Sequence, residues 1–333
     1  MHTVGPLCFR VRNDPDTVPS RPGQSAGQLL SPLQGGKGVV IVECALVRNL
    51  RVLIGLVVRG SNFKGRVCAR IEAEIEASRL LLAEHDLRLP PSGFIEPDFG
   101  DEAILFHNES SHMHRWQMLI WFYCVKPANS GGESPILDCR RIYELMNPEV
   151  REQFETKGLM YVRNFTDGLD VSWQSFFRTN DKSEVENYCL QASIDFEWKG
   201  DNGLRTRQLC PAVVRHPQTG ELVFFNQLQL HHISCLAPAV RESLLSMMNE
   251  EDLPRNVYYG DGSVIEDSAM AYLGELCRKT CVSFPWQAQD VLMLNNMLVA
   301  HSRNPFVGAR KIVVALGNLV SKEQVEQPAL INR

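Results

Sequence analysis

Short apolar runs at both ends of the chain enclose a middle part with helical patterns. Apolar positions at every second residue indicate strands, and a spacing of three or four indicates helices. This periodicity predicts short strands within 38–58 and at 103–106, 119–125, 159–165, 222–226, 281–284, 290–294, 297–300 and 311–316. It predicts helices at 66–85, 142–157, 171–177, 183–190, 239–248 and 267–278.

This order of elements predicts a mainly β fold with inserted helices. Many short strands around a helical middle are typical of a double-stranded β-helix, or jelly roll, with a large helical and mixed insertion at about 140–280. Residues 1–36 are rich in Pro, Gly, Ser and Asp, so we expect a loosely ordered lead-in there. Residues 37–333 are then expected to form one domain.

Composition narrows the range of partners. A net charge of -5 argues against nucleic-acid binding, which normally needs a basic face. Glu43, Arg48 and Arg51 interrupt the most apolar segments well short of the roughly 20 residues of a membrane span. The start lacks the pattern of a secretory signal, and the ten cysteines are scattered without paired zinc-finger spacing. We therefore expect buried free thiols, a cytoplasmic protein, and neither nucleic acid nor membrane as partner.

His107 and Glu109 are the first candidates for chemistry. They end an apolar strand pattern, and because side chains two apart on a strand share a face, both can reach one ion. With 9 His and 39 acidic residues, about one such pair is expected by chance. His301 lies in a second apolar run, where a histidine without a chemical role is the alternative. Two histidines and a carboxylate on one face of a metal are typical of non-haem Fe(II) oxygenases.

Arg310 is the second unusual feature, because it opens the nearly uncharged strand pattern at 311–316. A guanidinium in that position should be paired with an anion, and a carboxylate ligand that accepts two hydrogen bonds is a natural partner. The alternative is a surface salt bridge.

Several motifs occur in a fixed order along the chain: His-Asn-Glu-Ser-Ser at 107, Gly-Gly-Glu-Ser-Pro-Ile-Leu-Asp at 131, Tyr-Val-Arg-Asn-Phe at 161, His-Pro-Gln-Thr-Gly-Glu at 216 and the segment 301–310. In these motifs the chain resembles the taurine dioxygenase-like (TauD/TfdA) family of Fe(II)- and 2-oxoglutarate-dependent oxygenases. Within that family it is most similar to the amino-acid hydroxylases of non-ribosomal peptide biosynthesis. The resemblance extends over about two-thirds of the chain, from residue 104 to 319.

The resemblance implies roles for five residues. His107, Glu109 and His301 would bind Fe(II). Arg310 and Ser134 would bind the distal carboxylate of the cosubstrate 2-oxoglutarate, and O₂ would be the second cosubstrate. Because related halogenases lack the metal-binding carboxylate, Glu109 favours hydroxylation. The family pattern also differs here, since relatives usually have Asp-Asn where this chain has Asn295-Asn296, and we expect Asn295 to change how neighbouring groups orient His301.

The implied substrate is an amino acid or an amino-acid-derived small molecule of secondary metabolism, free or tethered to a carrier protein. Asn108, Arg163 and Asn226 are the candidate substrate contacts. One alternative keeps the fold and changes the outcome to desaturation, epoxidation or cyclisation. A non-catalytic jelly-roll binding protein is a second alternative, and a zinc hydrolase is a third, disfavoured because it leaves Arg310 unexplained. A homo-oligomer also stays open.

Overall fold

The computed structural model describes the backbone at residues 39–42, 55–58 and 94–95, and the chain in full at 100, 102–166 and 170–325. All these residues belong to one compact unit, Lys37–Arg333. The lead-in predicted for residues 1–36 and the helix predicted at 66–85 lie outside the described residues. No helix within the described part of the chain is long and apolar enough to cross a membrane.

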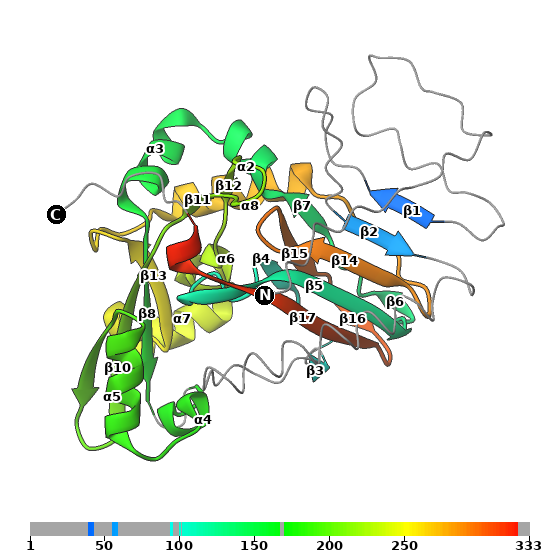
Figure 1. Cartoon of the computed structure of the whole chain (residues 1–333). Helices are drawn as coiled ribbons and strands as arrows, with labels where there is room; N and C mark the ends of the chain where they lie inside the picture. Colours follow the sequence, from blue (N-terminus) through cyan, green and yellow to red (C-terminus); the bar gives the residue numbers. More distant parts are fainter. Residues whose placement is uncertain are drawn as a thin grey trace, which may run out of the picture. The chain divides into compact units, whose positions relative to one another are not determined.

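The largest sheet is antiparallel and has β5 at its centre (Figure 1). Apolar side chains at every second position of β5, from Trp116 to Cys124, are at most 2% exposed and form one face of the core. Arg115 and Gln117 interrupt the apolar pattern at the start of the strand, which explains why the sequence predicted it only from residue 119. In spatial order the strands are β1 (Val39–Val42), β2 (Gly55–Val58), β14 (Val291–Asn295), β5 (Arg115–Lys126), β17 (Lys311–Ser321) and β3 (Phe94–Ile95).

A smaller three-stranded sheet carries the candidate metal ligands. Its central strand, β15 (Val299–Arg303), is buried along its whole length and pairs with β4 (Ile104–His107) and β7 (Ile136–Asp138). The register places His301 opposite His107. Two further short strands pair with one another: β6 (Ser130–Gly131), which precedes β7 in the chain, and β16 (Phe306–Val307), which follows β15.

Between β7 and β14 the chain forms the helices and a second, separate sheet, at the lower left in Figure 1. This antiparallel sheet has the order β13 (Arg255–Tyr259), β8 (Leu159–Phe165), β10 (Gly203–Cys210) and β9 (Ile194–Lys199), and a two-stranded sheet joins β11 (Val213–Arg215) to β12 (Leu222–Phe224). The helices are α2 (Cys139–Leu145), α3 (Pro148–Lys157), α4 (Trp173–Phe177), α5 (Lys182–Gln191), α6 (Leu228–His231), α7 (Pro238–Met247) and α8 (Asp267–Thr280). Short 3₁₀ helices occur at Ile233–Cys235, Glu250–Asp252 and Lys322–Gln324.

The structure confirms a mainly β fold with inserted helices, and it corrects some elements. The predicted helix at 142–157 is two helices, and the second begins with Asn147 as N-cap and Pro148 at the first position, as helix starts favour. The strand predicted at 281–284 is wrong, because only an isolated bridge joins Val282 to Ile136. Strands β9, β10 and β13 were not predicted. Apolar and charged residues alternate along β9, so the sequence carried a strand signal there, whereas four consecutive polar residues, Arg205 to Gln208, interrupt the pattern of β10.

Candidate metal centre

His107, Glu109 and His301 meet at one point, as predicted. Their ligand atoms all lie within 4.8 Å of one another. His107 Nε2 is 3.8 Å from Glu109 Oε2, and the two imidazole centroids are 4.3 Å apart. Both histidines are buried, whereas the Glu109 side chain is 26% exposed. The arrangement follows from the pairing of β4 with β15, which places the two histidines opposite one another and brings Glu109 in just beyond the end of β4.

Each imidazole can offer a lone pair to a metal. His107 Nδ1 lies 2.8 Å from the Leu105 carbonyl, to which it donates, so Nε2 is left without a proton. His301 packs its ring 5.1 Å from that of Phe122, and its buried Nδ1 has no hydrogen-bond partner in the described part of the chain. Burial, with His107 as a further cause, lowers the pKa of His301 well below its usual value. Two imidazoles and a carboxylate fit a divalent iron.

Asn296 holds the backbone of Glu109 on both sides. The Glu109 N–H donates to Asn296 Oδ1 at 2.7 Å, and Asn296 Nδ2 donates to the Glu109 carbonyl at 2.9 Å. The same Nδ2 donates to the Gln117 carbonyl of β5 at 2.8 Å, and Asn296 is fully buried. The Asn296 side chain therefore fixes the backbone position from which the Glu109 side chain extends toward the metal site. The Asn295-Asn296 pair is conspicuous in the sequence, but this role of Asn296 could not be predicted from it.

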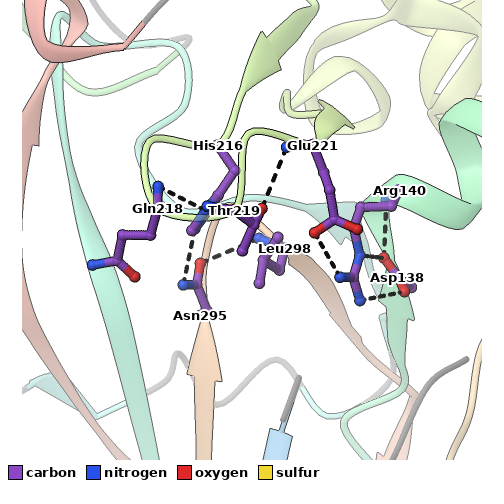
Figure 2. A network of polar contacts seen from close by, with 8 residues as sticks. All are labelled: Asp138, Arg140, His216, Gln218, Thr219, Glu221, Asn295 and Leu298. Atoms are coloured by element: carbon purple, nitrogen blue, oxygen red, sulfur yellow. Dashed lines mark hydrogen bonds and ion pairs between the residues drawn. The ribbon is translucent and has the colours of Figure 1, made fainter. Parts of the chain in front are cut away.

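Asn295 stabilises the turn before β15, whereas the sequence predicted an effect on the groups that orient His301. Its Oδ1 accepts from the backbone N–H groups of Met297 and Leu298, which shapes the turn between β14 and β15. Its Nδ2 is 3.1 Å from His216 Nε2 (Figure 2). The expected effect on the orientation of His301 is therefore replaced by an effect on the turn that leads into β15.

Charged contacts hold β7, the second strand that pairs with β15, in position. Arg140 Nη2 donates to Asp138 Oδ2 at 3.0 Å, and its Nη1 donates to Glu221 Oε2 at 2.9 Å (Figure 2). Asp138 ends β7 opposite Val299. Because Asp138 and Arg140 are buried, these contacts should hold the end of β7 firmly against β15, two residues from His301.

Replacing Asn296 with alanine is expected to weaken Fe(II) binding about 10–100-fold, the usual cost of losing a group that orients a metal ligand. The change removes both hydrogen bonds to the Glu109 backbone. Competition with a coloured chelator measures the affinity. The exposed Asn249 offers a matched control, and Asn249→Ala should bind iron as the wild type does. Equal affinities of the two variants would contradict the assigned role.

Asn108 and Asn226, two of the predicted substrate contacts, form hydrogen bonds within the protein. Asn108 is 1% exposed, and its Nδ2 donates to the carbonyls of Asn296 and Val299 at 2.7 and 3.2 Å. Its Oδ1 accepts from the Asn226 N–H at 3.1 Å, and Asn226 Oδ1 accepts from the Leu228 N–H that opens α6. Both side chains thus tie the end of β4 to the start of α6.

Arg310 and Ser134, the predicted cosubstrate contacts, are both buried. Arg310 Nε donates to the Gly132 carbonyl at 3.0 Å, and its guanidinium carbon is 5.5 Å from the centroid of the Phe306 ring. Trp286 Nε1 donates to Ser134 Oγ at 3.1 Å, a contact not foreseen from the sequence. Burial beside an apolar ring makes this guanidinium a strong partner for a carboxylate, so the residues fit an acidic cosubstrate.

Gly132 leaves room for Arg310, and Gly132→Ala is expected to raise the KM for 2-oxoglutarate about tenfold. An added Cβ would lie 3.0 Å from Arg310 Cδ and 3.0 Å from Phe306 Cβ, and φ is +74°. Backbone strain of this kind costs roughly 1–3 kcal/mol, and here it also displaces the guanidinium. Gly262, with φ of +84° and nothing within 4 Å, provides the control, since Gly262→Ala adds strain alone. A KM that changes equally in both variants would contradict this reading.

His112 is partly buried. Its ring packs 5.9 Å from that of Tyr161 and 5.3 Å from that of His231. His231 Nδ1 is 3.1 Å from the Gln227 carbonyl, and Arg163, the third predicted substrate contact, interacts electrostatically with both histidines. A basic cluster, which the sequence did not predict as a unit, is formed by His112, Tyr161, Arg163, His231 and Arg255.

The buried histidines should make the protein sensitive to acid. Burial, followed by the charges of Arg255 and Arg163, lowers the pKa of His231 from 6.5 to about 4. Between these values the unfolded chain binds a proton that the folded chain does not, so stability falls as the pH falls through this window. Each tenfold difference in proton affinity changes the free energy of unfolding by about 1.4 kcal/mol. Titration of His231 across this window should therefore lower the free energy of unfolding by about 3 kcal/mol. Urea unfolding of metal-free protein at several pH values should show a clearly shallower pH dependence for His231→Gln, and equal slopes would contradict the prediction.

Comparison with known proteins agrees with this site. The family model described as "Taurine catabolism dioxygenase TauD, TfdA family" matches residues 84–316. The dapdiamide synthesis protein DdaC of Enterobacter agglomerans is 41% identical over 227 residues, which are 68% of this chain and 69% of that protein. A clavaminate synthase-like protein of Arabidopsis thaliana is 29% identical over 227 residues, 65% of each chain. The chain thus spans about two thirds of the length of these relatives.

Among the solved structures that the chain matches is PvcB of Pseudomonas aeruginosa, with 13% identity, a TM-score of 0.38, and coverage of 72% of this chain and 66% of that chain. A taurine dioxygenase from Burkholderia xenovorans has 16% identity, a TM-score of 0.36, and coverage of 70% and 65%. The family match includes all three residues of the metal centre and Arg310. The chain therefore belongs to the TauD, TfdA family of dioxygenases.

Proposed function

We propose that this family member hydroxylates a small, amino-acid-derived substrate, with Fe(II) at His107, Glu109 and His301 and with 2-oxoglutarate as cosubstrate. The observation that carries the proposal is the meeting of the three ligand groups within 4.8 Å. The 41% identity to a dapdiamide synthesis protein supports a substrate from a biosynthetic pathway of secondary metabolism. The carboxylate of Glu109 favours transfer of oxygen to the substrate.

The chain's own residues position the reactants. Iron bound with 2-oxoglutarate and O₂ supplies the oxidising power, as cofactors do in such enzymes. Arg310 would bind the distal carboxylate of the cosubstrate, with Ser134 beside it. Asn296 keeps Glu109 in place, and the Phe122 ring packs against that of His301. Correct placement of the reacting groups is a large part of what the protein contributes.

An anaerobic titration tests the metal and cosubstrate assignment. Metal-free protein that receives Fe(II) and then 2-oxoglutarate under nitrogen should develop the weak visible charge-transfer band of a chelated keto acid. Absence of the band, with iron shown to be bound, would overturn the proposal. His301→Ala should give no band at iron concentrations that saturate the wild type, since it removes one of the three ligand groups.

The product and the form of the substrate require a second experiment. Succinate release is measured with candidate amino acids, each supplied free and loaded on a carrier protein. The molecular masses of the products are then measured by mass spectrometry. A gain of one oxygen is the expected result. A loss of two hydrogens would indicate desaturation or cyclisation. Release with only one of the two forms identifies whether the substrate is free or tethered.

We also infer that the protein works in a reducing compartment such as the cytoplasm. The seven cysteines within the described residues are free thiols, and burial raises the pKa of Cys139 to about 12. Thiols of this kind persist in a reducing environment. Fractionation of cells that produce the protein tests this inference.

A further inference from the structure

We propose that the basic cluster beside the metal centre binds a carboxylate of the substrate. This inference rests on the proposed function and names the part of the substrate that is recognised. The cluster consists of His112, Tyr161, Arg163, His231 and Arg255.

The strand pairing of the inserted sheet places two positive charges opposite one another. Tyr161, Arg163 and Phe165 share one face of β8, because side chains two apart on a strand point the same way. In the register of β13 with β8, Arg255 is the direct partner of Arg163. Like charges in this position repel, so the pair is stable only with an anion beside it.

Asp170 supplies one negative charge for the two guanidinium groups. Its Oδ2 accepts from Arg163 Nη2 at 3.1 Å and from Arg255 Nε at 2.9 Å, and its Oδ1 accepts from Arg255 Nη2 at 3.0 Å. Burial lowers the pKa of the two histidines, which are therefore neutral at pH 7. The cluster thus keeps a net charge of one positive unit, which matches a single carboxylate better than a doubly charged phosphate.

Two buried nitrogen atoms of the cluster have no hydrogen-bond partner in the described part of the chain: Arg163 Nε and His112 Nδ1. The Arg163 guanidinium packs against two aromatic rings, with its carbon 4.8 Å from the centroid of Phe165 and 4.4 Å from that of Phe176. Burial, with Arg255 as the next cause, lowers the pKa of Arg163 to about 10. A buried guanidinium donor without an acceptor is costly, and a carboxylate would relieve that cost.

The cluster lies next to the metal ligands. Gln227 Nε2 donates to the carbonyl of Asn108, the residue between His107 and Glu109, at 3.2 Å. The Gln227 backbone N–H donates to Tyr161 Oη at 2.9 Å. Gln227 therefore connects the loop that carries the metal ligands to Tyr161 of the cluster. A substrate carboxylate bound there would leave the rest of a small molecule beside the metal centre.

Matched pairs of acids and amides test the proposal. The probes are N-acetyl derivatives of the common amino acids and the carboxamides of the same compounds. They are titrated by calorimetry under nitrogen into protein loaded with Fe(II) and 2-oxoglutarate. We expect the wild type to bind at least one acid about tenfold or more tightly than its amide, since the ion pair is formed only by the acid.

Arg163→Gln should remove the preference for the acid and leave the affinity for the amide unchanged. Arg255→Gln, which keeps Arg163 paired with Asp170, should weaken binding of the acid less. Arg207→Gln is the matched control, because this partly exposed arginine on the same sheet forms ion pairs with Asp195 and Glu197. Acids and amides that bind equally to the wild type, or the absence of any binding acid, would overturn the proposal. So would a preference that persists in Arg163→Gln.

The charge-transfer band separates failure of this inference from failure of the proposed function. It is recorded first for the wild type and for each variant. A band in the wild type and in Arg163→Gln shows that the metal centre is assembled, so that a missing acid preference then counts against the carboxylate site alone. A wild type that binds iron but gives no band would overturn the proposed function and, with it, the basis of the carboxylate site.

Discussion

Replacing Glu109 with glutamine is expected to lower turnover and Fe(II) affinity by more than about 100-fold. Loss of a group that merely orients a ligand costs about 10–100-fold, so loss of a ligand itself should cost more. Glutamine has almost the same size, and the backbone contacts of Glu109 with Asn296 do not depend on its carboxylate. The variant should therefore fold normally, and the loss can be assigned to the metal bond.

Chelator competition measures the affinity, and succinate release measures the turnover. The exposed Glu102, seven residues earlier in the chain, provides a control, because Glu102→Gln removes the same charge without touching the metal centre. The metal-free forms of both variants should unfold at nearly the wild-type temperature. Wild-type iron affinity in Glu109→Gln would show that the triad is not the iron site.

The sequence was sufficient to predict the family, the mainly β fold and the enzyme class with its iron and 2-oxoglutarate, and these predictions are confirmed by the family match and the ligand triad. The local pattern placed His107 at the end of a strand, as the structure does. Glu109 lies in the turn just beyond that strand, where the contacts of its backbone with Asn296 position it. The distant partner His301 came from the order of the family's motifs. The roles assigned to Arg310 and Ser134 stay predictions that the experiments test.

The sequence did not predict the basic cluster, because its members come together through strand pairing over long distances. Arg163 and Arg255 are separated by about ninety residues and meet only because β13 pairs with β8. Polar residues interrupt the apolar pattern of β10, and β13 is only five residues long, so the sheet itself was not predicted. The same limit explains Asn296, whose role depends on a turn of the chain far from Glu109.

Replacing Arg310 with glutamine is expected to weaken 2-oxoglutarate binding by about 30-fold to several thousand-fold. Truncation of one partner of a buried, hydrogen-bonded charge pair costs about 2–5 kcal/mol, and each 1.4 kcal/mol is tenfold in affinity. Arg310 lies outside the ligand triad, so iron affinity should stay near the wild-type value. The charge-transfer band should then need far more 2-oxoglutarate to appear.

Arg310→Lys separates charge from geometry, because lysine keeps the charge but cannot form two parallel hydrogen bonds with a carboxylate. We expect its affinity for 2-oxoglutarate to lie between those of the wild type and Arg310→Gln. The half-exposed Arg141, paired with Glu144 on the same helix, gives a neutral control as Arg141→Gln. If Arg310→Gln bound 2-oxoglutarate as tightly as this control, the carboxylate would have to bind to another cation. Since Gly132 contacts Arg310, Gly132→Ala should then also leave the KM for 2-oxoglutarate unchanged, so the two variants test one site independently.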